Sequence, residues 1–132
     1  MNYELLLREH TLKVTPQRLG ILTLMHTYGH LSIEDLFEYI KKQFSSISLA
    51  TLYKNINAML ENKLITEVKI PNMKSKYEIA KDTHAHILCT KCGEFKDIAI
   101  NLDAVLSSTA LKTDYALTDT SVVFSGLCSK CK

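Results

Sequence analysis

The stretch 48-SLATLYKNINAMLENKLITEVKIPNMKSKYEIA-80 contains two hydrophobic periods in succession. Ser48 is a favourable N-cap, and apolar residues recur at helical spacing up to residue 60. Two β-prone runs follow, 64–70 and 76–80, and the residues between them favour a turn. We therefore predict an amphipathic helix followed by a β-hairpin.

The predicted helix has two different faces. One is apolar and comprises Leu49, Leu52, Ile56, Met59 and Leu60. The other is polar and comprises Thr51, Lys54, Asn55 and Ala58, with Tyr53 at the edge. A small residue at position 50 and polar neighbours would let the start of this helix approach DNA, touch thymine methyl groups and reach phosphate. Lys69, Lys74 and Lys76 flank the turn of the hairpin.

Two more helices are predicted before this stretch. The first is capped by Thr15, has Pro16 at its first position and stops at Gly29. The second begins at Ser32, which forms a capping-box pattern with Asp35. Several helices followed by a hairpin with a basic turn is the order of elements in a winged helix-turn-helix. The last helix of that fold enters the major groove. The same order also occurs without DNA binding, and the polar helix start favours the DNA-binding interpretation.

The C-terminal part has a different pattern. Residues 84–100 predict strand, turn and strand, Asn101 caps a helix that ends near Lys112, and a last strand covers 120–127. The inward residues of that helix are expected to be Leu102, Val105 and Leu106. So small an α/β unit has a poor core, and it usually needs a cross-link, a bound metal or a partner chain to be stable.

The predicted fold is therefore α+β, with a winged-helix domain at 1–82 and a small α/β domain at 83–132. The chain has 132 residues and a net charge of +2, too small to indicate nucleic-acid binding by itself. No apolar run is long enough to span a bilayer, and the N-terminus lacks the pattern of a secretory signal. We expect a cytoplasmic protein without membrane contacts, whose cysteines bind metal or take part in redox chemistry.

The four cysteines form two CxxC pairs, Cys89 with Cys92 and Cys128 with Cys131. Each CxxC turn presents two thiolates to one side of a metal, and two such turns complete the tetrahedral set of structural zinc. The alternatives are a thioredoxin-like redox pair and four free buried thiols. A redox motif would need only one pair and would precede a helix, so the pattern favours zinc.

Histidines in the same stretch point to a second metal. His84 and His86 alternate, so both face the same side of a strand, whereas Cys89 faces the other side. Candidate further ligands are Glu78, Asp97 and His30. Imidazole and carboxylate donors suit Fe(II), Mn(II) or Zn(II).

A lone histidine is more often a surface or core group than a ligand. We keep that interpretation for His10 and His26. A His/carboxylate site can also catalyse, so a metalloenzyme is an alternative of another class. Five protein ligands leave little room for a substrate, and no general base is evident, so we expect no enzyme.

The chain resembles the ferric uptake regulator family of metal-dependent repressors over nearly its whole length. The resemblance is carried by the motifs LKVTPQRLGIL, GHLSIEDLF, SLATLYKNINAMLENKLI, KYE, HAHILCTKCG and CSKC. It implies a DNA-binding winged helix and a C-terminal dimerisation half. It implies structural zinc on Cys89, Cys92, Cys128 and Cys131, and a regulatory Fe(II) or Mn(II) on His30, Glu78, His84, His86 and Asp97.

Three positions bear on the branch of the family. Asp97 resembles the residue found in the peroxide-sensing branch. In that branch Fe(II) reacts with hydrogen peroxide and a ligand histidine is oxidised. The resemblance indicates His30 and His84 as the oxidation targets. Ala85 stands where iron sensors often have Asp. Glu78 matches the iron sensors, whereas the peroxide branch usually has Asp. Iron-responsive repression without peroxide sensing is therefore the alternative, and zinc and nickel sensors belong to the same family.

Taken together, these features predict a homodimeric, metal-dependent transcriptional repressor that senses peroxide. Its partner is double-stranded DNA with a palindromic operator. Lys13 is the candidate minor-groove contact, Tyr53 the base-edge contact and Lys54 the phosphate contact.

Overall fold

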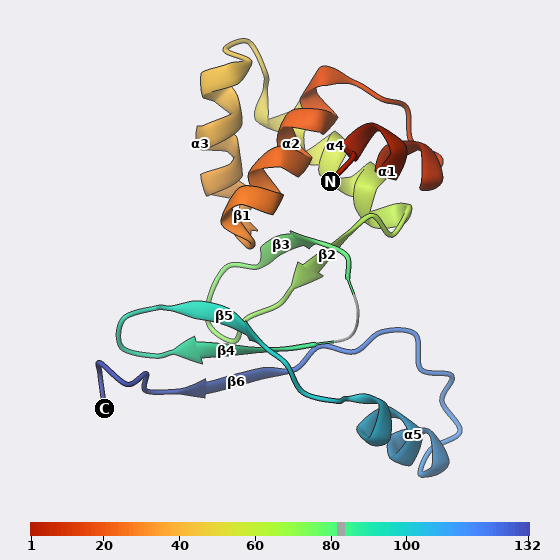
Figure 1. The fold of residues 1–132 in the computed structure, drawn as a ribbon, viewed down its shortest axis with the longest axis vertical. Helices are drawn as coiled ribbons and strands as arrows, with labels where there is room; N and C mark the ends of the chain where they lie inside the picture. Colours follow the sequence, from red (N-terminus) through yellow and green to blue (C-terminus); the bar gives the residue numbers. More distant parts are fainter. Residues whose placement is uncertain (82–83) are drawn as a thin grey trace. The chain divides into compact units, whose positions relative to one another are not determined.

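The computed structural model describes residues 1–81 and 84–132, and these form two compact units, 1–80 and 81–132 (Figure 1). The boundary predicted between residues 82 and 83 lies outside the described residues. Within the described ranges, every helix is too short or too polar to cross a lipid bilayer.

The first unit is a winged helix-turn-helix. Its elements are α1 (Tyr3–Glu9), α2 (Pro16–Tyr28), β1 (Leu31–Ser32), α3 (Ile33–Gln43), α4 (Leu49–Glu61), β2 (Ile65–Val68) and β3 (Lys76–Ile79). The strands form an antiparallel sheet in the order β1-β3-β2, so the predicted hairpin is its β2–β3 part. The predicted helix and hairpin of the opening stretch are thus confirmed.

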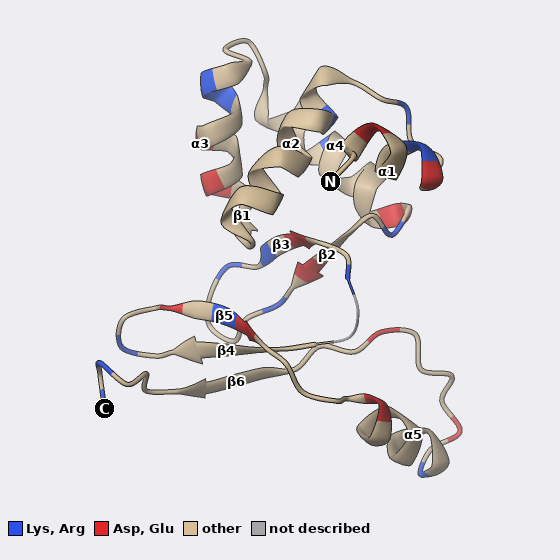
Figure 2. Cartoon of the chain, in the orientation of Figure 1, with Lys and Arg blue, Asp and Glu red and all other residues tan. Residues whose placement is uncertain are grey.

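Side-chain caps determine where the main helices begin. The cap oxygens accept hydrogen bonds from backbone N–H groups three residues later: Thr15 from Arg18, Ser32 from Asp35 and Ser48 from Thr51. Gly29 ends α2 at a φ of 79°, which a residue without a Cβ adopts without strain. In α3, Glu34 and Asp35 are in the first turn and two lysines are in the last, which complements the helix dipole (Figure 2).

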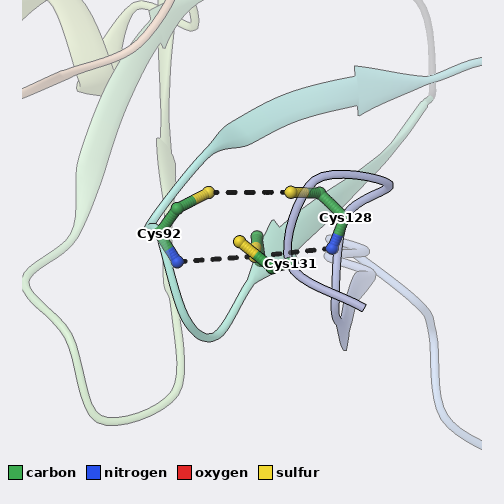
Figure 3. A group of neighbouring side chains, drawn as sticks. Cys92, Cys128 and Cys131 are labelled. Carbon is green, nitrogen blue, oxygen red and sulfur yellow. Dashed lines mark hydrogen bonds between the residues drawn. The ribbon is translucent and has the colours of Figure 1, made fainter.

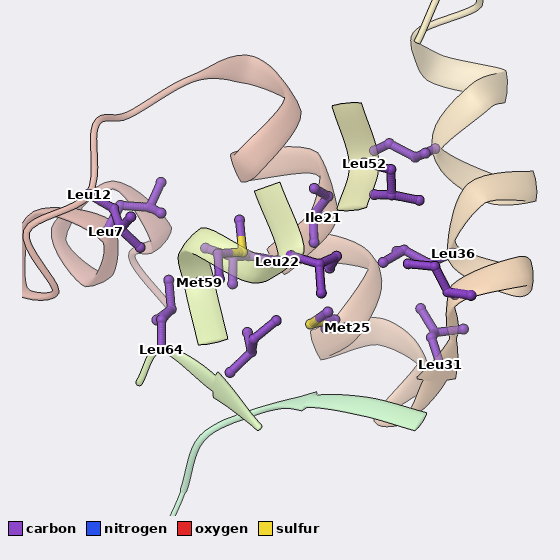
Figure 4. Packing of buried hydrophobic residues seen from close by; sticks show 14 of the residues in the cluster. Leu7, Leu12, Ile21, Leu22, Met25, Leu31, Leu36, Leu52, Met59 and Leu64 are labelled. Carbon is purple, nitrogen blue, oxygen red and sulfur yellow. The ribbon is translucent and has the colours of Figure 1, made fainter. Parts of the chain in front are cut away.

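A single apolar core holds this unit together (Figure 4). Leu22 of α2, Leu36 of α3 and Leu52 of α4 are each fully buried in it. The prediction for Leu49 is wrong, since 44% of its surface is exposed. The buried face of α4 begins one turn later, at Leu52, and the first turn of the helix projects beyond the core.

Two elements of this unit were not predicted. Helix α1 has only seven residues, and its packing depends on the fully buried Leu7. Strand β1 has two residues, Leu31 and Ser32, and exists because β3 pairs with it. Neither element is long enough to show a hydrophobic period.

The second unit contains β4 (Ala85–Cys89), β5 (Phe95–Ile98), α5 (Asp103–Leu111) and β6 (Val123–Gly126). Its sheet has the order β5-β4-β6, in which β4 pairs antiparallel with β5 and parallel with β6. The predicted order of strands and helix is confirmed. The fold as a whole is α+β, as predicted.

The core of the second unit is small. Its buried apolar residues are Ala85, Leu88, Cys89 and Leu102. Helix α5 contains no buried residue, and the prediction for Val105 is wrong, because 57% of its surface is exposed. The helix also starts one residue later than predicted: Leu102 is at the N-cap, and Asn101 Oδ1 accepts from the N–H of Asp103 at 2.9 Å.

Candidate metal centres and nucleic-acid interface

The parallel pairing of β4 with β6 brings the two CxxC turns together. Cys89 lies at the end of β4 opposite Gly126, and the second CxxC follows directly after β6. The four sulfur atoms all lie within 4.8 Å of one another (Figure 3). All four cysteines are free thiols rather than disulfides.

The sulfur geometry fits a tetrahedral metal. Zn–S bonds of about 2.3 Å place two sulfurs of a tetrahedron about 3.8 Å apart. Cys92 Sγ and Cys128 Sγ are separated by 3.8 Å. The backbone N–H groups of Cys92 and Cys128 both point at Cys89 Sγ, at 3.5 Å each. The set therefore has the closed, all-thiolate geometry that a structural zinc ion requires.

The thiols of this site differ in acidity. Backbone N–H groups of Cys92 and Cys128 stabilise the Cys89 thiolate and lower its pKa to about 6. A hydrogen bond with Cys128, together with burial, raises the pKa of Cys131 to about 12. A metal that binds all four sulfurs must therefore displace protons at neutral pH.

A second group of ligand atoms lies on β4 and β5. The strand register pairs His86 with Asp97, and His84 is two residues from His86 on the same face. The two Nε2 atoms are 3.0 Å apart. Asp97 Oδ1 lies 3.3 Å from His86 Nε2 and 3.5 Å from His84 Nε2.

These distances suit donors that converge on one cation. Metal–nitrogen bonds of about 2.0–2.1 Å with angles between 90° and 110° place two donor atoms about 2.9–3.4 Å apart. The ring of His86 stacks on Phe95 with an interplanar angle of 11°, which fixes its orientation. The ammonium group of Lys81 pairs with Asp97 Oδ2, a contact that the sequence pattern did not predict.

The remaining predicted ligands lie in the first unit. His30 precedes β1 and Glu78 is on β3, and the register that pairs Leu31 with Tyr77 brings them together. His30 Nε2 and Glu78 Oε2 are 2.8 Å apart. Each unit therefore presents imidazole and carboxylate donors in direct contact, a chemistry that favours Fe(II), Mn(II) or Zn(II).

The predicted DNA-contacting residues are all accessible on the first unit. Lys13 is exposed between α1 and α2, and Tyr53 and Lys54 are exposed on α4. No acidic residue lies in the first turn of α4, so its positive dipole end is available to an anion. On the hairpin, Lys74 forms an ion pair of 2.8 Å with Glu34, which the sequence pattern did not predict.

The profile of the Ferric uptake regulator family matches residues 9–125 of the chain. The Peroxide-responsive repressor PerR of Staphylococcus epidermidis is 28% identical over 128 residues, which cover 96% of this chain and 85% of that protein. The Ferric uptake regulation protein of Neisseria meningitidis serogroup A is 32% identical over 130 residues, which cover 96% and 90%.

The fold is also similar to that of solved structures. The crystal structure of the Campylobacter jejuni peroxide stress regulator aligns with a TM-score of 0.74 at 38% identity. The alignment covers 99% of this chain and all of that chain. Relatives named for peroxide and relatives named for ferric uptake thus both match nearly the full length.

Proposed function

The chain belongs to the ferric uptake regulator family, and we propose that it is a metal-dependent transcriptional repressor that senses hydrogen peroxide. It binds double-stranded DNA as a homodimer and releases it after peroxide treatment. The observation that carries the proposal is the presence of His/carboxylate ligand groups separate from the thiolate zinc site.

The regulatory ion in this proposal is Fe(II) or Mn(II). Its ligands are His30, Glu78, His84, His86 and Asp97. The first two lie in one unit and the other three in the second, so an ion that takes all five fixes the angle between the units. If that angle suits DNA, metal and DNA must strengthen each other's binding reciprocally.

Peroxide sensing follows from the choice of metal. The five ligands would hold Fe(II), which would supply the redox chemistry for hydrogen peroxide to oxidise a ligand histidine: the ring would gain one oxygen atom and the other would leave as water. The oxidised ring would no longer offer a nitrogen lone pair to the metal, and the metal would be released. His30 and His84 are the proposed oxidation targets. Mn(II), which has similar ligand preferences, would support DNA binding without this reaction.

Two observations favour different branches. Asp97 favours the peroxide branch, as do the names of the Staphylococcus and Campylobacter relatives. Glu78 favours an iron-responsive uptake repressor without peroxide sensing, as does the name of the Neisseria relative. The second function is therefore the specific alternative to be tested.

The dimer and the DNA contacts complete the proposal. Strand β6 is at the edge of its sheet. Phe124 on the strand and Leu127 directly after it are 45% and 53% exposed, which supports pairing with a second copy. A two-fold dimer reads a palindrome. Lys13 enters the minor groove, Tyr53 contacts a base edge and Lys54 contacts phosphate.

The test of the switch compares Fe(II)- and Mn(II)-loaded protein before and after hydrogen peroxide. DNA affinity is measured on a duplex selected by the Mn(II) form, and added oxygen is mapped by peptide mass spectrometry. We expect only the iron form to lose affinity, with oxygen on His30 or His84. Retained affinity without oxidised histidine would leave the iron-responsive alternative, and turnover of a substrate would favour a metalloenzyme.

The test of the DNA contacts compares Tyr53→Ala with Lys54→Ala. Loss of a base contact should relax base preference at about 1–3 kcal/mol. Loss of a phosphate contact should weaken all sequences and reduce the salt slope by about one. Equal losses and equal slopes for the two variants would contradict the assigned roles.

A further inference from the structure

We propose that Arg18 and Thr11 are positioning residues for DNA recognition. They fasten the segment 11–15, here called the Lys13 arm, to the recognition helix α4. The inference rests on the proposed function, in which Lys13 and residues of α4 contact the same DNA. The fastening explains how Lys13, which lies outside α4, keeps a fixed distance from the DNA-contacting residues on that helix.

Arg18 connects the middle of the arm to α4. Its side-chain Nη1 donates to the backbone carbonyl of Lys13 at 2.9 Å, and its Nε donates to Asn55 Oδ1 at 3.0 Å. The amide of Asn55 is itself held, because its Nδ2 donates to the carbonyl of Thr51 at 3.2 Å. One guanidinium thus joins the arm to the middle of α4.

Thr11 connects the beginning of the arm to the same helix. Its hydroxyl lies 3.0 Å from Oδ1 of Asn62, the residue that caps the C-terminus of α4, and 2.7 Å from the carbonyl of His10, so the two acceptors share its single proton. Asn62 is oriented by a 2.8 Å hydrogen bond from its Nδ2 to the carbonyl of Ala58. Thr11 also has a φ of 59°, which is strained for a β-branched residue.

The two fastening points, Asn55 in α4 and Asn62 at its C-cap, are seven residues apart. Residues at this spacing lie on the same face of a helix, roughly two turns apart. The arm is therefore held along one side of α4, while the side chain of Lys13 is exposed and makes neither of these contacts. Arginine suits this role better than lysine, because its planar fork can donate to two fixed acceptors at once.

The first test is a double-mutant cycle with Lys13→Ala and Arg18→Lys, which keeps the charge. The probe is a duplex selected from a random pool by the Mn(II)-loaded wild-type protein. Lys13→Ala should lower affinity about fivefold or more in the wild type. In the Arg18→Lys background it should lower affinity less than about twofold, because the arm no longer holds Lys13 in place.

Arg8→Lys is the matched control, since Arg8 is exposed on α1 and the same exchange there leaves the arm untouched. Lys13→Ala should cost the same in this background as in the wild type. An equal loss from Lys13→Ala in the wild type and in Arg18→Lys would overturn the inference.

A second measurement needs no DNA. Amide hydrogen exchange at residues 12–14 should be faster in Arg18→Lys and in Thr11→Val than in the wild type or Arg8→Lys. Unchanged exchange would overturn the inference even if DNA binding is metal-dependent. Faster exchange in a protein that selects no duplex would support the fastening and overturn the proposed function instead.

Discussion

Removal of zinc from the four-cysteine site is expected to unfold residues 81–132 while residues 1–80 stay folded. The perturbation is a strong chelator or the substitution Cys128→Ser. The reason is that the buried apolar residues are divided unequally between the two units. The fifteen members of the main core cluster all lie between Leu7 and Ile65.

The magnitude follows from what the second unit buries. Leu88 and Leu102 are its large buried apolar side chains, and together they contribute about 3–6 kcal/mol. Structural zinc contributes on the order of 10 kcal/mol at neutral pH. A small domain has a net stability of about 5–15 kcal/mol. Loss of the ion thus removes about as much free energy as the whole net stability of the unit.

The assay is limited proteolysis combined with hydrogen exchange, before and after chelation. A protected fragment that ends near residue 80 and rapid exchange beyond it are expected. The control is a mild chelator that removes only the ion held by nitrogen and oxygen donors. A zinc-free protein that keeps its C-terminal protection, or that unfolds along the whole chain in one transition, would refute this reasoning.

Three further predictions follow from individual residues. Lys63 has a φ of 59°, so Lys63→Gly should raise the free energy of unfolding in urea by roughly 0.5–1 kcal/mol relative to Lys63→Ala. Zinc affinity should rise with pH through neutrality in competition titrations, because the pKa of Cys131 is about 12 and its proton must leave on binding. Glu34→Gln should free Lys74 for phosphate and steepen the salt dependence of DNA binding by about one, whereas Glu38→Gln should not.

Local chemistry explains why much of the fold was predictable. The caps at Thr15, Ser32 and Ser48 each accept a hydrogen bond from a backbone N–H three residues later. Because the two partners are close in the sequence, a short sequence pattern is enough to predict the contact. Burial is different, because it depends on what packs against a side chain. Leu49 and Val105 fit a helical period and are nevertheless exposed.

The candidate sites show the same contrast. The CxxC spacing indicates ligands from a few adjacent residues, whereas the contact between His30 and Glu78 depends on the pairing of β1 with β3. The sequence pattern indicated both residues as candidates because of their chemistry. It had no local signal for the contact of Lys81 with Asp97, or for the two anchors of the Lys13 arm.

The two ligand chemistries suit different tasks under the proposed function. The thiolate set comes from one unit and closes around its ion, so it stabilises that unit whatever the regulatory state. The His/carboxylate groups occur in both units, as His30 with Glu78 and as His86 with Asp97. An ion shared between them would change the relation of the units when it binds or leaves. Under the proposed function this ion is therefore the signal, and its ligands are the groups that peroxide must reach.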